Sequence, residues 1–138
     1  MSYIGITQAN IQTAINLWIS DPTLCESTYG HISFWDTSAV TNMSSLFTSK
    51  TTFNTNINAW DVSNVITMQR MFMNATSFHQ PLNEWNVSNV TNMFQMFSGS
   101  TNFNQPLNEW NVSNVTIMSQ TFHSCTLFDQ PIGNWDVR

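Results

Sequence analysis

The sequence predicts an α/β solenoid of the leucine-rich-repeat kind, in which 25-residue rungs of a short strand and a short helix stack behind an N-terminal capping helix. Tryptophan recurs at intervals of 25 residues, at Trp35, Trp60, Trp85, Trp110 and Trp135. Other apolar residues keep the same interval, among them Val40, Val65, Val90 and Val115, Met43, Met68, Met93 and Met118, and Phe47, Phe72, Phe97 and Phe122. A fixed period of this length is typical of repeat proteins, whose units bury apolar side chains only against their neighbours.

The composition limits the classes of function. A chain of 138 residues forms one domain, and its charged fraction of 8% is well below the usual ~25%. It contains only three Lys and Arg residues, so it has no basic stripe for nucleic acid. No apolar run approaches the ~20 residues of a membrane span. We therefore expect neither nucleic-acid binding nor a membrane span.

Residues 1–30 are expected to form an N-terminal cap. Apolar residues at positions 11, 14, 15, 18 and 19 fall on one face of a helix over about 7–19, with Thr7 as its N-cap. Asp21-Pro22 is expected to stop this helix. An amphipathic helix in this place would cover the apolar end of the stack.

Strands are predicted where each repeat reads apolar-x-x-Trp-x-Val, a spacing typical of leucine-rich repeats. These segments lie near 32–38, 57–63, 82–88, 107–113 and 132–137. Alternation along a strand would point Trp85 and Val87 into the core and turn Glu84, Asn86 and Ser88 outward.

A short helix is predicted after each strand, because Val90, Met93 and Phe97 are spaced at i, i+3 and i+7. The repeats would occupy 31–138 as about four and a half to five rungs, the last of them incomplete. An open last rung would expose Trp135 and Val137 to self-association.

The run FNQPLNEWNVSNVTIM at 103–118 resembles the BspA-like leucine-rich-repeat surface proteins. Residues 14–18 and 29–43 are similar to the leader that precedes such repeats. Members occur as bacterial surface proteins, in protists and algae, and in large DNA viruses. The resemblance implies a leucine-rich-repeat-like solenoid and adhesion or protein binding, and it implies no catalytic residues. The sequence lacks a secretion signal at its N-terminus, so we expect an intracellular or virion-associated protein, or a trimmed fragment of a surface protein.

Stacking would align residues of the same repeat phase into columns on the outward strand face, which repeat proteins use for partners. The candidate partner-binding residues are Asp36, Asp61, Glu84, Asn86, Glu109 and Asn111. The alternative is that these Asn and acidic side chains only solvate the sheet. A linear column provides few converging ligands, so no metal site is expected.

The function predicted from these features is a non-catalytic protein-interaction or adhesion module with a protein partner and no cofactor. The alternative is a structural protein, such as a viral or surface-layer component, that forms homo-oligomers through the open C-terminal rung. His31, His79 and His123 occupy different phases or distant rungs, so we expect neither a zinc site nor a catalytic triad. Cys25 and Cys125 are expected to be free thiols.

Overall fold

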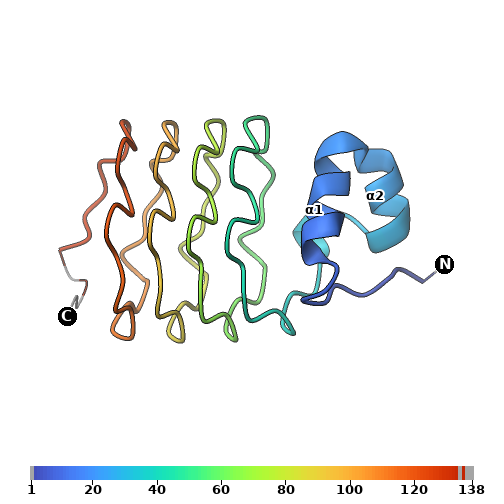
Figure 1. The fold of residues 1–138 in the computed structure, drawn as a ribbon, viewed down its shortest axis with the longest axis horizontal. Coiled ribbons are helices and arrows are strands. Elements are labelled where there is room, and N and C mark those ends of the chain that lie inside the picture. Colours follow the sequence, from blue (N-terminus) through green and yellow to red (C-terminus); the bar gives the residue numbers. More distant parts are fainter. Residues whose placement is uncertain (1, 134, 136–138) are drawn as a thin grey trace.

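A computed structural model describes residues 2–133 and 135. The chain begins with two helices, α1 (Ile11–Ser20) and α2 (Pro22–Tyr29), followed by the short 3-10 helix η1 (Ile32–Phe34). From there the chain winds into a row of irregular loops that lie side by side, with the two helices at one end (Figure 1). We call each 25-residue loop a coil and number them as coil 1 (32–56), coil 2 (57–81), coil 3 (82–106) and coil 4 (107–131).

The two helices pack on each other and on coil 1. Helix α1 buries Ile11, Ala14 and Ile15 along one face, as expected for an amphipathic cap. The helix predicted over about 7–19 begins only at Ile11. The Asp21-Pro22 pair, predicted as a stop, also starts α2, because the Asp21 side chain accepts a hydrogen bond from the backbone N–H of Leu24.

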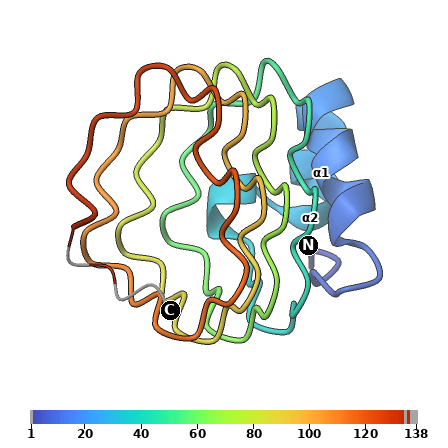
Figure 2. The ribbon, with the colours of Figure 1, turned by 60° about the vertical axis from the view of Figure 1, so that its left-hand side comes forward.

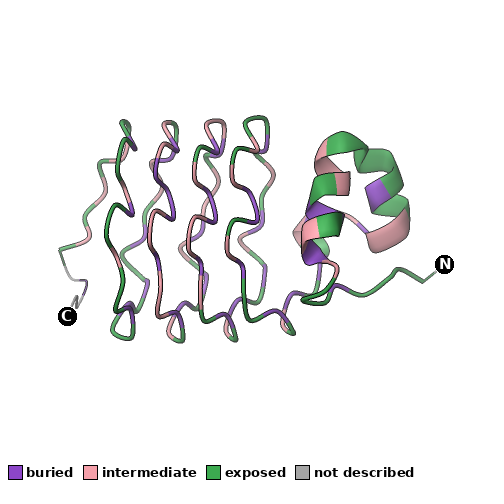
Figure 3. Ribbon diagram, viewed as in Figure 1, coloured by how far each residue is buried: buried purple, intermediate pink, exposed green. Residues whose placement is uncertain are grey.

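The core of the stack consists of columns of aromatic rings. Phe72 lies between Phe47 and Phe97, with ring centroids 5.3 and 5.5 Å away and nearly parallel planes. Trp35 and Trp60 stack at 6.1 Å. Figure 3 shows buried residues alternating with exposed ones along every coil, and Figure 2 shows the coils superposed along the stack. The prediction that the periodic apolar residues point inward is confirmed for Val65 and Met68, which are fully buried.

The predicted α/β solenoid of strand-plus-helix rungs is wrong. In residues 2–133 and 135, β-pairing is limited to isolated parallel bridges that link Asn42, Thr67, Asn92 and Ile117. The segments predicted as strands near 57–63, 82–88 and 107–113 are turns, and the one near 32–38 contains η1. Of the segment 132–137, only 132, 133 and 135 lie within the described residues.

The helix predicted from Val90 to Phe97 is also absent. Gln95 adopts a left-handed backbone with φ 53°, which interrupts a right-handed helix. The N–H of Met93 donates to the carbonyl of Ile117 in the next coil at 2.8 Å, while the N–H of Met96 closes a turn onto the carbonyl of Met93. Successive turns bring every third or fourth residue inward, so their apolar spacing imitates that of a helix.

On one side of the stack, backbone hydrogen bonds join neighbouring coils. Most of these bonds donate toward the next coil, while the N–H groups of Ile66, Thr91 and Thr116 donate back to the preceding one. We call this side the amide ladder and assign to it residues 41–49, 66–74, 91–99 and 116–124. From 43 to 49, alternate N–H groups donate toward the next coil. The donors are Met43, Ser45, Phe47 and Ser49, and the acceptors are the carbonyls of Thr67, Gln69, Met71 and Met73. The same pattern repeats from 68 to 74 and from 93 to 99.

The N-terminal end of the amide ladder is completed by two glutamine side chains. Gln8 accepts hydrogen bonds from the N–H groups of Thr41 and Asn42 and donates to the carbonyl of Asn42 at 2.8 Å. Gln12 donates to the carbonyl of Leu46 at 3.1 Å. These amides take the place of the backbone of a preceding coil, so the cap satisfies polar groups as well as covering apolar ones.

Candidate partner-binding face

The predicted partner-binding residues Asp36, Asp61, Asn86 and Asn111 form one exposed column, which we call the Asx column. Each side chain closes a tight turn. The Oδ1 atom of Asp36 accepts from the backbone N–H of Ser38 at 3.0 Å and from its hydroxyl at 2.6 Å. Asp61 makes the same two bonds with Ser63. The column is therefore held in place by its own repeat motif, an aspartate or asparagine followed two residues later by serine.

The asparagines of the column form the same turn with a neutral side chain. The Oδ1 atom of Asn86 accepts from the N–H of Ser88, and that of Asn111 accepts from the N–H of Ser113, both at 3.1 Å. Aspartate and asparagine are thus interchangeable for the turn, and only the aspartates add charge.

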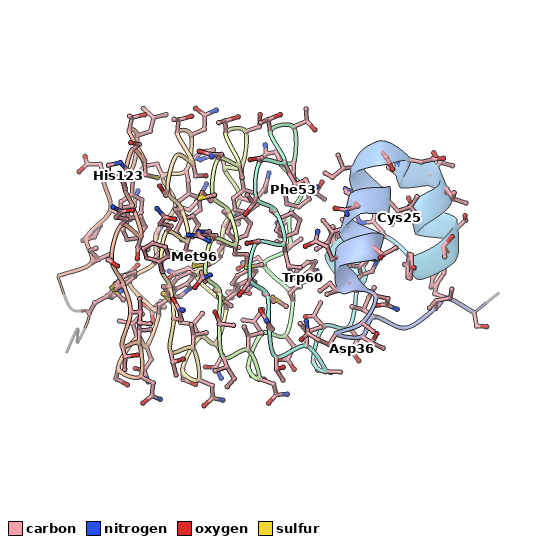
Figure 4. The ribbon with its side chains drawn as sticks, viewed as in Figure 1. Cys25, Asp36, Phe53, Trp60, Met96 and His123 are labelled. Atoms are coloured by element: carbon pink, nitrogen blue, oxygen red, sulfur yellow. The ribbon has the colours of Figure 1, made fainter. Side chains whose placement is uncertain are left out.

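The two aspartates are stabilised as anions. Hydrogen bonds from the hydroxyl and N–H of Ser38 lower the pKa of Asp36. Ser63 lowers the pKa of Asp61 in the same way, although the charge of Asp36 one coil away opposes the shift. Only Oδ1 of each carboxylate is used in these turns, and Asp36 lies at the solvent-facing surface beside the helices (Figure 4). The second oxygen of each is available to a partner.

A second exposed column, the glutamate column, contains Glu84 and Glu109 in coils 3 and 4. The backbone under each is anchored to the preceding coil. The N–H of Glu84 donates to Oδ1 of Asn58 at 3.3 Å, and that of Glu109 donates to Oδ1 of Asn83 at 3.1 Å. The exposed Phe34 occupies the same phase in coil 1. All six predicted residues are exposed, and together the Asx and glutamate columns make up what we call the acid face.

Asparagines that were not singled out from the sequence join the coils beside the acid face. The Nδ2 atoms of Asn64, Asn89 and Asn114 donate to the carbonyls of the serines 26 residues earlier, at 2.7 to 2.8 Å. Coil 1 has Ala39 at this position, where no earlier coil offers a carbonyl. The replacement of asparagine by alanine in coil 1 was the signal in the sequence that this asparagine bonds to the preceding coil.

Tryptophan links the coils from inside. The indole N–H of Trp60 donates to the carbonyl of Ile32 at 2.8 Å, and Trp85 and Trp110 repeat the bond with Ile57 and Leu82. The acid face therefore stands on a backbone that is fixed by side-chain hydrogen bonds on both sides.

Of the two predicted self-association residues, Trp135 lies at the opposite end of the stack from the helices. Trp135 stacks on Trp110 with centroids 6.1 Å apart and is only 9% exposed. Val137 lies outside the described residues.

Other reactive groups are dispersed. Cys25 and Cys125 are buried free thiols, and burial raises the pKa of each to about 11. Within residues 2–133 and 135, no three His, Cys, Asp or Glu side chains are grouped to hold a metal ion. A search of the same residues finds no helix long and apolar enough to cross a membrane.

A shallow groove of about 400 Å³ crosses coils 1 to 4 and is lined mainly by polar side chains. Its lining residues are Asn54, Ser77, His79, Asn102, Asn104 and Leu127. The amide oxygens of Asn54 and Asn104 are occupied by hydrogen bonds from the following coil. The groove is therefore formed by the stacking of the coils, and these two of its amide oxygens already have hydrogen-bond partners within the protein.

These features define a repeat protein of stacked 25-residue coils with a helical cap and an acidic lateral face. Comparison with family models identifies the family: residues 22–135 match the one described as Mycoplasma protein of unknown function, DUF285, and the chain belongs to it. No curated protein and no solved structure matches the chain.

Proposed function

We propose that this chain is a non-catalytic module that binds a basic protein partner through the acid face. The observation that carries the proposal is the pair Asp36 and Asp61, held by identical turns in adjacent coils. Neither carboxylate is paired with a cation in the part of the chain that the structure describes. Their charge is therefore available to a partner.

The spacing of the acid face suits an extended basic segment. Parallel bridges join successive coils and place them at the ~4.8 Å spacing of neighbouring strands, so the column repeats a hydrogen-bond acceptor at that interval. Fixed acceptors lower the entropy lost on binding. The net charge of −5 would also steer a cationic partner toward the protein.

The repeat architecture supports an interaction role, and we extend the proposal to adhesion. The resemblance to BspA-like surface proteins adds weight to a surface role. A leucine-rich-repeat fold is no part of this proposal, because the coils lack the strand and helix that such a fold requires.

The test exploits the interchangeable turns. The variant Asp36→Asn/Asp61→Asn should keep both turns, as Asn86 and Asn111 do, while removing two charges. A control variant, Glu26→Gln/Asp129→Asn, removes two exposed charges elsewhere. With octalysine as the probe at low salt, calorimetry should show about tenfold weaker binding for the test variant, and less than about threefold for the control.

Equal losses in the two variants would show that only net charge matters and would reject the acid face as a site. Lack of measurable octalysine binding to the wild-type protein would reject the proposal of a basic partner. Circular dichroism and urea unfolding of both variants would confirm that neither change disturbs the coils.

A further inference from the structure

Phe34 is the most exposed large apolar side chain in the part of the chain that the structure describes, at 85%. It belongs to coil 1 and shares its repeat phase with Glu84 and Glu109 of the glutamate column, so it lies beside the acid face. The phenylalanines of the core columns, such as Phe72, are fully buried. The Phe34 ring therefore adds little to the stability of the stack and is presented to solvent where the proposed partner binds.

The ring of Phe34 is held in place by an aromatic row that starts on α1. The rings of Trp18 and His31 meet edge to face with centroids 4.8 Å apart, and the centroid of Phe34 lies 5.8 Å from that of His31. The backbone N–H of Ser33 donates to Nδ1 of His31 at 3.1 Å, which fixes the imidazole. The Phe34 ring is therefore positioned before a partner binds.

A carboxylate lies beside this ring. The residue between Phe34 and Asp36 is the buried Trp35, whose backbone is extended with φ −62° and ψ 137°. Phe34 and Asp36 are both exposed, so their side chains share the outer surface. Ser38 occupies Oδ1 of Asp36 and leaves the second oxygen available. A planar cation can therefore stack on the Phe34 ring and pair with the carboxylate through its edge.

The protein contains an example of such stacking on its amide ladder. The guanidinium of Arg70 lies over the ring of Phe94, with its Cζ atom 5.2 Å from the ring centroid. Its Nε–H donates to the side-chain oxygen of Gln95 at 2.9 Å, so the same group uses its planar face and its edge at once. Arg70 is the only arginine within residues 2–133 and 135, and it is engaged there. Among these residues, no arginine is left to cover Phe34.

We propose that Phe34 and Asp36 form a recognition site for an arginine side chain of the basic partner. This inference rests on the proposed function, because the acid face attracts the partner, and it adds the identity of the preferred cation. The guanidinium would stack on the Phe34 ring, while an N–H at its edge donates to the free carboxylate oxygen of Asp36. A lysine ammonium can reach the carboxylate but has no planar face to stack on the ring.

The experiment compares octaarginine and octalysine as probes by calorimetry at low salt. The two probes carry equal charge, so the dissociation constant of octalysine divided by that of octaarginine measures the preference for arginine. Phe34→Leu keeps an apolar side chain but removes the ring, and the preference should fall about two- to fivefold below that of the wild type. Phe34→Trp should retain or raise the preference, since indole binds cations most strongly. The control Leu127→Ala, at an exposed apolar residue of coil 4, should leave the preference unchanged.

NMR provides a second readout that does not depend on small differences in affinity. In the complex of the wild-type protein with octaarginine, nuclear Overhauser effects should connect the Phe34 ring protons to arginine Hδ protons. Their absence from a complex that forms would overturn the arginine site.

The outcomes separate this inference from the proposed function. An unchanged preference in Phe34→Leu, with octalysine binding still weakened in Asp36→Asn/Asp61→Asn, would overturn the arginine site and leave the acid face as the binding surface. An equal fall of the preference in Leu127→Ala would also overturn the arginine site. Failure of both probes to bind the wild-type protein would reject the site together with the proposed function.

Discussion

Substitution of Ser45 by glycine or alanine distinguishes the coil backbone from a helix. Ser45 is exposed, has φ 62°, and donates its N–H to the carbonyl of Gln69 at 2.9 Å. A left-handed backbone costs a non-glycine residue roughly 1–2 kcal/mol, whereas glycine adopts it freely. We predict that Ser45→Gly is more stable than Ser45→Ala.

The expected difference in unfolding free energy follows from two opposing terms. Glycine relieves the left-handed strain but loses roughly 0.5–1 kcal/mol through the greater freedom of its unfolded chain. The Gly variant should therefore exceed the Ala variant by about 0.5–1 kcal/mol. In a helix the order would be reversed, with Ala better by about 1 kcal/mol.

Urea unfolding followed by tryptophan fluorescence measures both variants. Asn16, exposed in the middle of α1, provides the matched control, because there the Ala variant should exceed the Gly variant by about 1 kcal/mol. If Ala is favoured at both positions, the left-handed assignment at Ser45 is wrong.

Three further predictions follow. Gln8→Ala should lower the free energy of unfolding by about 1 kcal/mol, since the exposed N–H groups of Thr41 and Asn42 would exchange the Gln8 oxygen for water. Urea unfolding measures this, and an unchanged free energy would contradict the capping role. Folding lowers the pKa of Asp61 from its ordinary 3.8, so the charged carboxylate stabilises the protein above pH about 4, and this contribution is lost as the pH falls through the folded-state pKa. The free energy of unfolding of the wild type should therefore exceed that of Asp61→Asn by less at pH 3 than at pH 6. A difference that stays constant over this range would refute the turn as its cause. Burial raises the pKa of both Cys25 and Cys125 to about 11, so these thiols should react with a disulfide reagent at pH 8 only when the protein unfolds. Rapid labelling of the folded protein would contradict their burial.

The repeat period and the inward residues were predictable because they depend only on apolar spacing. Trp60, Phe72 and Val65 are buried as their recurrence indicated. The exposure of Asp61 and Glu84 was predictable as well, since both lie next to buried tryptophans in the repeat.

The local backbone was not predictable from the same spacing. Successive turns and a short helix both bury Val90 and Met93, and the difference lies in the left-handed φ of Gln95, a residue type that gives no left-handed signal. Likewise, Trp85 and Val87 are both buried, as the alternation of a strand would require. The backbone N–H of Trp85, however, donates to the carbonyl of Leu82 and closes a turn. Side-chain bonds between coils, such as that of Asn64, replace strand pairing there.

The central claim is that backbone hydrogen bonds between neighbouring coils take the place of helical ones within each repeat. Scalar couplings across hydrogen bonds, measured by NMR, test it directly. We predict couplings from the N–H of Met68 to the carbonyl of Asn92 and from Phe72 to Met96, whose N···O distances are 3.0 and 2.8 Å. A coupling from Phe72 to the carbonyl four residues before it would contradict the account and restore a helix to each repeat.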